Sequence, residues 1–255
     1  MFRRFERSLI YHPTRGLEFT GAQTGLPCDD VFFKTSCGVK LHGWFFRANS
    51  DSPRKHRVVL FCHGNGGNIC NRLDVYRVLL DSGVNVFVFD YRGYGRSDAR
   101  KLDEEGTYQD AMAAYQWLRG KGFASRDIIV YGESLGGGIA SELALRAPVG
   151  GLILQSTFTS IPALGAELYK WLPVRWINTI RYDTLGKLPR IKVPILILHS
   201  REDRLVAFHH CEENLAAANE PKIFCELRGG HNDPLGDRDR FLQGIERFWE
   251  KIEHG

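Results

Sequence analysis

Residues 132–136 read GESLG, a G-x-S-x-G pentapeptide, and they suggest chemistry more directly than any other part of the sequence. The pentapeptide follows the apolar run Ile128–Tyr131 and precedes a helical stretch that continues to Arg146. A serine on such a sharp turn from strand to helix presents its hydroxyl at the carboxyl edge of a sheet. The pentapeptide alone is a weak motif, but its position predicts that Ser134 is a nucleophile.

A serine hydroxyl is a poor nucleophile at neutral pH and needs a histidine base that a carboxylate orients. Two acids, Glu202 and Asp203, follow the seventh predicted strand, and His231 follows the eighth on a glycine-flanked loop. The chain order serine, acid, histidine fits a nucleophile on this kind of turn. We predict the triad Ser134, Asp203 and His231, with Glu202 as the first competitor for the acid and Asp183 as a weaker one.

An oxyanion hole requires two backbone N–H groups that point at the same position, about 3 Å away. The third strand ends in the glycine-rich turn HGNGGN at residues 63–68. We predict that the N–H groups of Asn65 and Leu135 form the hole and that His63 braces the turn. Cys62, beside it, ends a strand and is assigned to the core rather than to a thiol nucleophile.

The histidines and cysteines show no metal-ligand spacing such as H-x-x-x-H or C-x-x-C. We therefore predict no metal site and no cofactor. His209 and His210 begin a predicted helix, and we expect both side chains to face solvent. The six cysteines are expected to be reduced and mostly structural, because a chain of 255 residues does not need disulfides to be stable.

Eight apolar runs predict the strands of one central sheet. The later runs show no polar alternation, which is expected of parallel strands covered by helices on both faces. Strand and helix patterns alternate along the chain, and this predicts an α/β fold with a mostly parallel sheet. The runs are Val31–Ser36, Val39–Arg47, Arg57–Cys62, Val84–Asp90, Asp127–Glu133, Gly151–Ser156, Pro194–Ser200 and Lys222–Arg228.

Helical patterns lie between these runs. Tyr108–Leu118 carries an apolar stripe at helical spacing, with Thr107 and Asp110 placed like a capping box, and a second stripe runs from Phe241 to Ile252. Thr157–Lys192 is longer than a crossover requires. We predict a single domain, residues 1–255, with a small cap at 157–192.

The predicted cap is rich in aromatic and apolar side chains, which could wall a substrate pocket. The residues proposed for this wall are Phe158, Leu168, Trp171 and Trp176. Six basic residues against two acidic ones give the cap a net charge of +4. A solvated basic face is the simpler interpretation, and attraction to acidic substrates or an anionic lipid surface is the alternative.

Taken together, several segments resemble the α/β-hydrolase superfamily: GESLG, HGNGGN, DYRGYGRS at 90–97, Asp203 with Val206, and Gly230-His231. The resemblance is closest to the intracellular serine-hydrolase branch with the bud-emergence-type proteins and the "alpha/beta hydrolase domain-containing" enzymes, some of which remove palmitoyl groups from proteins. It covers roughly residues 30 to 252 and implies an α/β-hydrolase fold with an Ser-Asp-His triad. It also implies that residues 90–97 form a structural loop. Members of the branch often begin with a membrane anchor, which this sequence lacks.

Composition and charge limit the function further. With 43% hydrophobic and 25% charged residues the chain is expected to be globular, and a net charge of +4 is too weak for a nucleic-acid partner. No apolar run is long enough to span a membrane, so we expect a cytoplasmic protein, membrane-associated if an N-terminal anchor was removed. The expected partners are a small-molecule ester or acyl substrate and, at the basic cap, an anionic membrane surface. The sequence does not indicate an oligomeric state.

The sequence supports one leading hypothesis, a serine carboxylesterase that acts on short to medium acyl chains through an acyl-enzyme. Thioesters are included in this class. A depalmitoylase-like thioesterase and a peptidase or amidase are the alternatives among hydrolases. A non-catalytic scaffold is disfavoured because no member of the predicted triad is missing.

Overall fold

A computed structural model describes residues 2–170 and 178–254 of the chain, and its centre is an eight-stranded sheet. The strands are β2 (Cys28–Lys34), β3 (Lys40–Phe46), β4 (Val58–Cys62), β6 (Asn85–Asp90), β7 (Ile128–Glu133), β8 (Gly151–Gln155), β9 (Ile195–Ser200) and β10 (Lys222–Leu227). Their order across the sheet is β10-β9-β8-β7-β4-β6-β3-β2. β3 pairs antiparallel with β2 and β6, and the other neighbours are parallel. The predicted fold class is confirmed.

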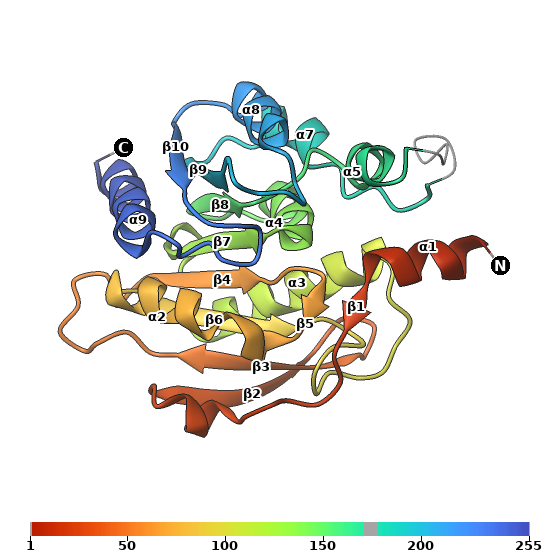
Figure 1. Ribbon diagram of the computed structural model, residues 1–255. Helices are drawn as coiled ribbons and strands as arrows, with labels where there is room; N and C mark the ends of the chain where they lie inside the picture. Colours follow the sequence, from red (N-terminus) through yellow and green to blue (C-terminus); the bar gives the residue numbers. More distant parts are fainter. Residues whose placement is uncertain (1, 171–177, 255) are drawn as a thin grey trace.

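Helices cover both faces of this sheet (Figure 1). One face carries α2 (Leu73–Asp81) and α9 (Arg238–Glu253), and the other carries α3 (Glu104–Gly120), α4 (Leu135–Arg146) and α8 (Phe208–Ala217). The two covered faces explain why the sequence of β4 is apolar throughout. Val58, Leu60 and Cys62 pack into the core under α3 and α4, whereas Val59 and Phe61 pack into the core under α2. Side chains of a strand alternate between faces, so a strand covered on both faces has no polar position.

The segment between β8 and β9 contains α5 (Ile161–Leu168), α7 (Thr184–Lys187) and the 3-10 turn η4 (Leu188–Arg190). Ser160 caps α5 by accepting a hydrogen bond from the backbone N–H of Ala163 (3.2 Å). Of the side chains predicted to wall a pocket here, Phe158 is buried and Leu168 is exposed. Trp171 and Trp176 lie outside the described residues.

The N-terminal segment folds into elements that the sequence patterns did not predict. The helix α1 (Phe2–Ile10) leads into the short strand β1 (His12–Pro13), which pairs in parallel with β5 (Gly66–Gly67). In Figure 1, α1 and α5 lie near each other at one end of the molecule. The carboxylate of Glu6 joins α1 to the chain after α5, because it accepts hydrogen bonds from the backbone N–H groups of Thr179 (2.6 Å) and Ile180 (2.9 Å).

The capping box predicted at Thr107 and Asp110 is wrong. The helix α3 begins earlier, and its cap is Asp103, which accepts a hydrogen bond from the N–H of Gly106 (2.9 Å). Asp110 is instead fully buried and pairs with Arg92 (Nη2 to Oδ1, 2.9 Å). This pair anchors the 90–97 loop to α3, and it supplies the partner that a buried carboxylate requires. The remaining connections include the turns η1 (Gly21–Thr24), η2 (Ile69–Arg72) and η3 (Ser125–Asp127).

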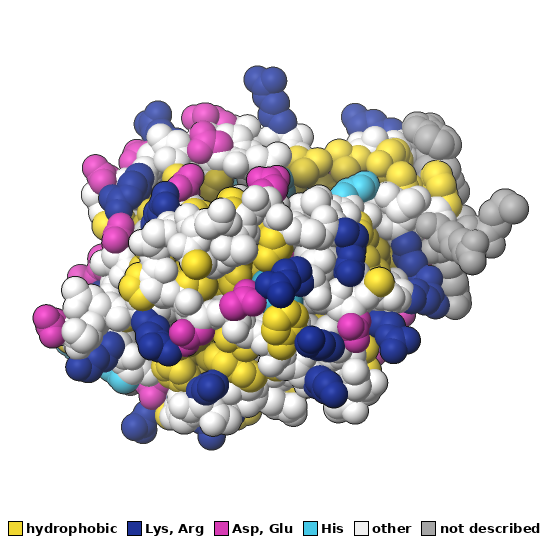
Figure 2. Space-filling model, turned by 90° about the horizontal axis from the view of Figure 1, so that it is seen from below, with side chains coloured by type: hydrophobic (Ala, Val, Ile, Leu, Met, Phe, Trp, Pro, Cys, Tyr) yellow, Lys and Arg dark blue, Asp and Glu magenta, His cyan; other side chains and the backbone are white. Residues whose placement is uncertain are grey.

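The surface matches the weak net charge of the sequence. On the face that Figure 2 shows, lysine and arginine side chains are scattered among acidic, polar and apolar ones. Within the described residues, every helix is too short or too polar to cross a membrane. All six cysteines are free thiols.

Candidate active site

Ser134 lies between the end of β7 and the first residue of α4, on the turn that the pentapeptide predicted. Its backbone has φ 51° and ψ −116°, a strained conformation that costs about 1–3 kcal/mol in a residue with a β-carbon. Two hydrogen bonds hold it, from Ser134 N–H to the carbonyl of Gln155 and from Gly137 N–H to the carbonyl of Ser134, both 2.9 Å. Gly136 is required here, because a β-carbon would overlap the carbonyl oxygen of Cys62.

The structure brings Ser134, His231 and Asp203 together from three separate loops. His231 Nε2 lies 3.0 Å from Ser134 Oγ, and His231 Nδ1 lies 2.7 Å from Asp203 Oδ2. Since the ionised carboxylate can only accept, Nδ1 carries a proton and donates it to Asp203. In neutral His231, Nε2 is therefore free to accept the proton of the serine hydroxyl. This is the geometry that a serine nucleophile and its base require.

The surroundings of Asp203 favour the ionised form of its carboxylate. Burial alone would raise its pKa, but the hydrogen bond from His231 and the backbone N–H groups of Val206 and Leu205 hold the pKa below its ordinary value. Both backbone nitrogens lie 2.9 Å from Oδ1, so this oxygen accepts the hydrogen bonds of the turn, and Oδ2 accepts the one from His231. The carboxylate side chain is fully buried. His231 consequently has a fixed orientation and a permanent negative partner.

The competing assignments do not reach His231. Glu202 makes no hydrogen bond with His231 and accepts one from the N–H of Gly229 (3.3 Å). Asp183 caps α7 by accepting from the N–H of Gly186 (3.0 Å). Cys62 is fully buried, and burial raises the pKa of its thiol to about 12, so it stays protonated and unreactive.

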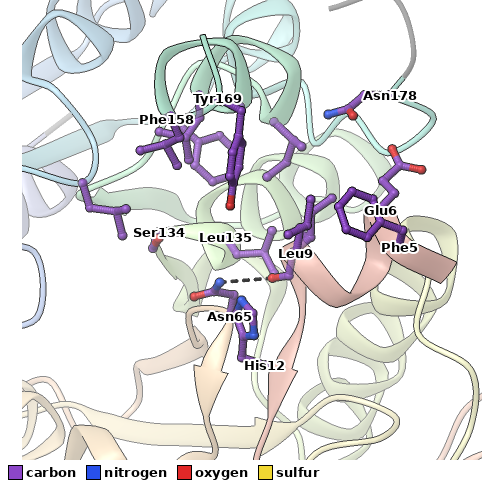
Figure 3. A pocket seen from close by; sticks show the side chains of 16 residues that line it. Phe5, Glu6, Leu9, His12, Asn65, Ser134, Leu135, Phe158, Tyr169 and Asn178 are labelled. Atoms are coloured by element: carbon purple, nitrogen blue, oxygen red, sulfur yellow. Dashed lines mark hydrogen bonds between the residues drawn. The ribbon is translucent and has the colours of Figure 1, made fainter. Parts of the chain in front are cut away.

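Asn65 and Leu135, predicted for the oxyanion hole, lie near Ser134 and line the same pocket (Figure 3). Leu135 is the first residue of α4, where backbone N–H groups have no partner within the helix. Two hydrogen bonds help to hold the loop at Asn65. The side-chain amide of Asn65 donates to the carbonyl of Ile10 (3.1 Å), and the hydroxyl of Tyr94 donates to the backbone carbonyl of Asn65 (2.8 Å). His63 is fully buried beside them, and burial lowers its pKa to about 3.

Ser134 stands between two cavities of different character. The first, the apolar pocket, has a volume of about 340 Å³ and is lined chiefly by Phe5, Leu9, Ile10, Phe158, Leu164 and Leu168. The second, the polar pocket, has a volume of about 510 Å³ and is lined on its polar side by Asn71, Arg72, Asp74, Glu133 and Asp233. Arg72 and Glu133 form a two-pronged ion pair there, with Nε to Oε2 and Nη2 to Oε1 both 3.0 Å.

The wall of the apolar pocket contains residues that the sequence patterns missed. Phe5, Glu6, Leu9 and Ile10 come from α1, and Figure 3 shows α1 side chains facing Tyr169 across the pocket. The missed signal is the apolar spacing of Phe5 and Leu9, four residues apart on one helical face. Phe158 and Leu168, by contrast, were predicted for the pocket and do line it.

Comparison with known proteins agrees with this geometry. A family model described as serine aminopeptidase, S33, matches residues 53–187, more than half of the chain. The chain belongs to this family and is an α/β-hydrolase. The resemblance seen in the sequence is thereby confirmed, and the chain is a hydrolase.

Relatives of this α/β-hydrolase are known in several organisms. The chain is 38% identical to an uncharacterized Mycobacterium tuberculosis protein, Rv2307c, over 95% of its own length and 86% of that protein. It is 30% identical to the α/β-hydrolase domain-containing protein WAV2 of Arabidopsis thaliana, over 96% and 85% of the two chains. It is 33% identical to the lysophosphatidylserine lipase ABHD12 of Danio rerio, over 65% and 47%.

Two solved structures show the same fold. The Pyrococcus furiosus esterase Pf2001 superposes with a TM-score of 0.77 at 21% identity, covering 96% of this α/β-hydrolase and 98% of that chain. The esterase EaEST of Exiguobacterium antarcticum gives a TM-score of 0.68 at 20% identity, with coverage of 87% and 100%.

Proposed function

We propose that this α/β-hydrolase is a serine esterase that cleaves carboxylic esters of short to medium acyl chains, and the corresponding thioesters, through an acyl-enzyme. The observation that carries the proposal is the chain of two hydrogen bonds from Ser134 to His231 (3.0 Å) and from His231 to Asp203 (2.7 Å) beside an apolar pocket. A buried acid, an oriented histidine and a strained serine at a pocket form the arrangement that activates a hydroxyl.

Each residue has a defined role in the proposed reaction. Ser134 Oγ attacks the ester carbonyl while its proton moves to His231 Nε2, and Asp203 stabilises the imidazolium that forms. The N–H groups of Asn65 and Leu135 bind the oxyanion of the tetrahedral intermediate. His231 then gives its proton to the leaving group, whose bond to the carbonyl carbon breaks. A water molecule, deprotonated by His231, releases the acid from Ser134 in the second half of the cycle.

The two cavities suggest where the parts of the substrate lie. The apolar pocket suits the acyl chain, and its 340 Å³ lies at the lower end of the usual range of about 300–1,000 Å³ for ligand pockets, which favours short to medium chains. The polar pocket on the other side of Ser134 suits a hydroxylated leaving group. The activities of two similar proteins, the structurally similar esterase Pf2001 and the lysophosphatidylserine lipase ABHD12, support an ester as the scissile bond.

The family description names an aminopeptidase, so amide cleavage is the main competing activity. An aminopeptidase must bind the ammonium group of its substrate, usually with a free carboxylate near the nucleophile. Glu133, the acid adjacent to Ser134, is already neutralised by Arg72 through its two-pronged pair. This pairing removes Glu133 from that role, whereas Asp233 of the polar pocket forms no ion pair among the described residues, so hydrolysis of an aminoacyl amide is the comparison that separates the two activities.

The experiment is a panel of p-nitrophenyl esters from acetate to palmitate, with acyl thioesters and an aminoacyl amide, assayed on wild type and Ser134→Ala. We expect Ser134→Ala to lower kcat by roughly 10⁴ to 10⁶-fold without changing the thermal midpoint. The matched control is Ser141→Ala in α4, whose hydroxyl donates only to the carbonyl of Gly138. More than a tenth of wild-type turnover in Ser134→Ala would refute the nucleophile, and a rate that rises to palmitate or is highest for the amide would refute the substrate class.

A further inference from the structure

Three potential metal ligands from α5 and α8 meet at a place that plays no part in the proposed reaction. They are Glu167 near the end of α5 and the neighbouring residues His209 and His210 at the start of α8. Glu167 Oε1 lies 3.0 Å from His209 Nε2 and 3.3 Å from His210 Nε2. The three ligand atoms lie within 4.8 Å of one another. Two imidazoles and a carboxylate thus converge on one small volume.

His210 is the residue that most needs an explanation. The sequence predicted that its side chain faces solvent, but the whole residue is buried. Its Nε2 has no hydrogen-bond partner among the described residues, although it points toward Glu167. A buried polar atom without a partner is costly, so a ligand at this position would remove a real penalty.

The other ring nitrogen of His210, Nδ1, faces Thr159: it lies 2.9 Å from the hydroxyl oxygen and 3.3 Å from the backbone nitrogen, whose N–H points at it. Ligation of a metal through Nε2 requires the tautomer in which Nδ1 donates to the Thr159 hydroxyl oxygen instead of accepting from that backbone N–H. Metal-binding histidines almost always donate their second N–H to an oxygen in this way.

The spacing fits a tetrahedral ion. With metal–ligand distances of about 2.0–2.1 Å, two ligands of a tetrahedral Zn²⁺ lie roughly 3.3 Å apart. The two distances from Glu167 Oε1, 3.0 and 3.3 Å, are close to this value without any movement of the backbone. The side chains of Glu167 and His209 are 37% and 45% exposed, so the cluster opens to solvent and a water molecule can complete the shell. Imidazole with carboxylate is a ligand set that favours zinc over magnesium or calcium.

We propose that Glu167, His209 and His210 form a binding site for one divalent transition-metal ion of the zinc type, which clamps α5 onto α8. The ion has a structural role, because the cluster shares no residue with Ser134, His231 and Asp203. α5 carries Leu164 and Leu168 of the apolar pocket, and α8 begins directly after the turn that holds Asp203. Metal binding therefore fixes one wall of the pocket relative to the acid loop. The sequence showed no metal-ligand spacing here because the third ligand, Glu167, comes from a different helix than His209 and His210.

The test is a titration of the untagged, metal-free protein with zinc chloride by calorimetry, with cobalt chloride as a spectroscopic probe of tetrahedral coordination. Three variants act on the site: Glu167→Gln and His209→Gln remove an exposed ligand each, and Thr159→Val removes the hydroxyl that orients His210. The matched control is His56→Gln, which removes an exposed histidine 3.8 Å from the carboxylate of Asp127.

We expect one zinc equivalent to bind wild type and to raise its thermal midpoint, since a ligand specific to the folded state stabilises it. Binding should weaken at least roughly tenfold in Glu167→Gln and in His209→Gln, about tenfold in Thr159→Val, and not at all in His56→Gln. Absence of stoichiometric binding, or a loss below tenfold in both ligand variants, would overturn the proposal and leave the cluster an ordinary ion pair. The readout is binding, so the result stands apart from whether the protein proves to be an esterase.

Discussion

Replacing Glu6 with alanine should detach α1 from the apolar pocket and thereby change which acyl chains are hydrolysed. The carboxylate of Glu6 is buried and accepts three hydrogen bonds, from Thr179 N–H (2.6 Å), Thr179 Oγ1 (2.6 Å) and Ile180 N–H (2.9 Å). Hydrogen bonds to a charged group contribute about 1.5–3 kcal/mol each, so the three together stabilise the docked position of α1 by roughly 4–9 kcal/mol. A helix of nine residues is too short to be stable in water by itself.

The effect on catalysis follows from the pocket wall. Hexanoate has four more methylenes than acetate, and at about 0.8 kcal/mol each their full burial favours hexanoate by about 3 kcal/mol, or about 200-fold in kcat/KM. Phe5, Leu9 and Ile10 of α1 form one side of the pocket. If they supply about half of the burial, Glu6→Ala lowers the preference roughly 10 to 15-fold, while acetate hydrolysis changes less than about threefold.

The assay compares kcat/KM for p-nitrophenyl acetate and hexanoate in wild type, Glu6→Gln and Glu6→Ala. The amide keeps one acceptor oxygen, so Glu6→Gln should fall between the other two. The matched control is Asp237→Ala, which removes a carboxylate that caps α9 (Arg240 N–H to Oδ1, 3.0 Å) away from the pocket. An unchanged ratio of hexanoate to acetate in Glu6→Ala would refute the role of α1 as a wall of the acyl site.

Three further predictions concern the acid, the elbow and pH. Asp203→Asn should lower kcat roughly 10⁴-fold with the fold retained, whereas Glu202→Gln should lower it less than about tenfold; steady-state kinetics on one ester would show the reverse order if the acid were Glu202. Gly136→Ala should lower the free energy of unfolding in urea by at least about 1–3 kcal/mol, because its β-carbon would overlap the carbonyl of Cys62. Gly120→Ala, at the last residue of α3 where a β-carbon meets no other atom, should be neutral or stabilising by up to about 1 kcal/mol. Equal effects of the two substitutions would contradict the close contact at Gly136. The lowered pKa of Asp203 contributes stability that is present above the ordinary carboxyl pKa of about 3.9 and is lost as pH falls through the folded value. The difference between the unfolding free energies of wild type and Asp203→Asn should therefore be constant above pH of about 5 and shrink below about 4. A difference that stays constant down to pH of about 2 would show that the carboxyl pKa is not lowered.

The parts of the fold that the sequence predicted well are those with strong local signals. The buried strands are solidly apolar, and Gly136 in the elbow is required because a β-carbon would overlap the backbone, so the strands along the chain and the turn that carries Ser134 can be predicted from the sequence. Because parallel strands end at one edge of the sheet, the loops after β7, β9 and β10 had to lie close together. His231 and Asp203 meet Ser134 for this topological reason.

The features that were missed depend on contacts between distant segments. Asp110 has the spacing of a helix cap, but burial against Arg92 determines its role. His210 stands at the polar start of a helix, and only contacts with distant segments, such as the one that carries Thr159, make it buried. The apolar side of α1 was visible in the sequence, yet its partner surface on α5 could not be known before the chain was folded. Local patterns predict elements, and tertiary packing assigns them their partners.

The central claim is that Ser134 forms a covalent acyl-enzyme, and mass spectrometry of the trapped intermediate tests it most directly. The protein is mixed with a fluorophosphonate, or with p-nitrophenyl hexanoate and quenched in acid, and the peptide containing residue 134 is analysed. We predict one adduct per chain on Ser134 of the folded protein, and no adduct on Ser134→Ala or on heat-denatured wild type. An adduct on another residue, or ester hydrolysis by wild type with no adduct under either condition, would contradict it.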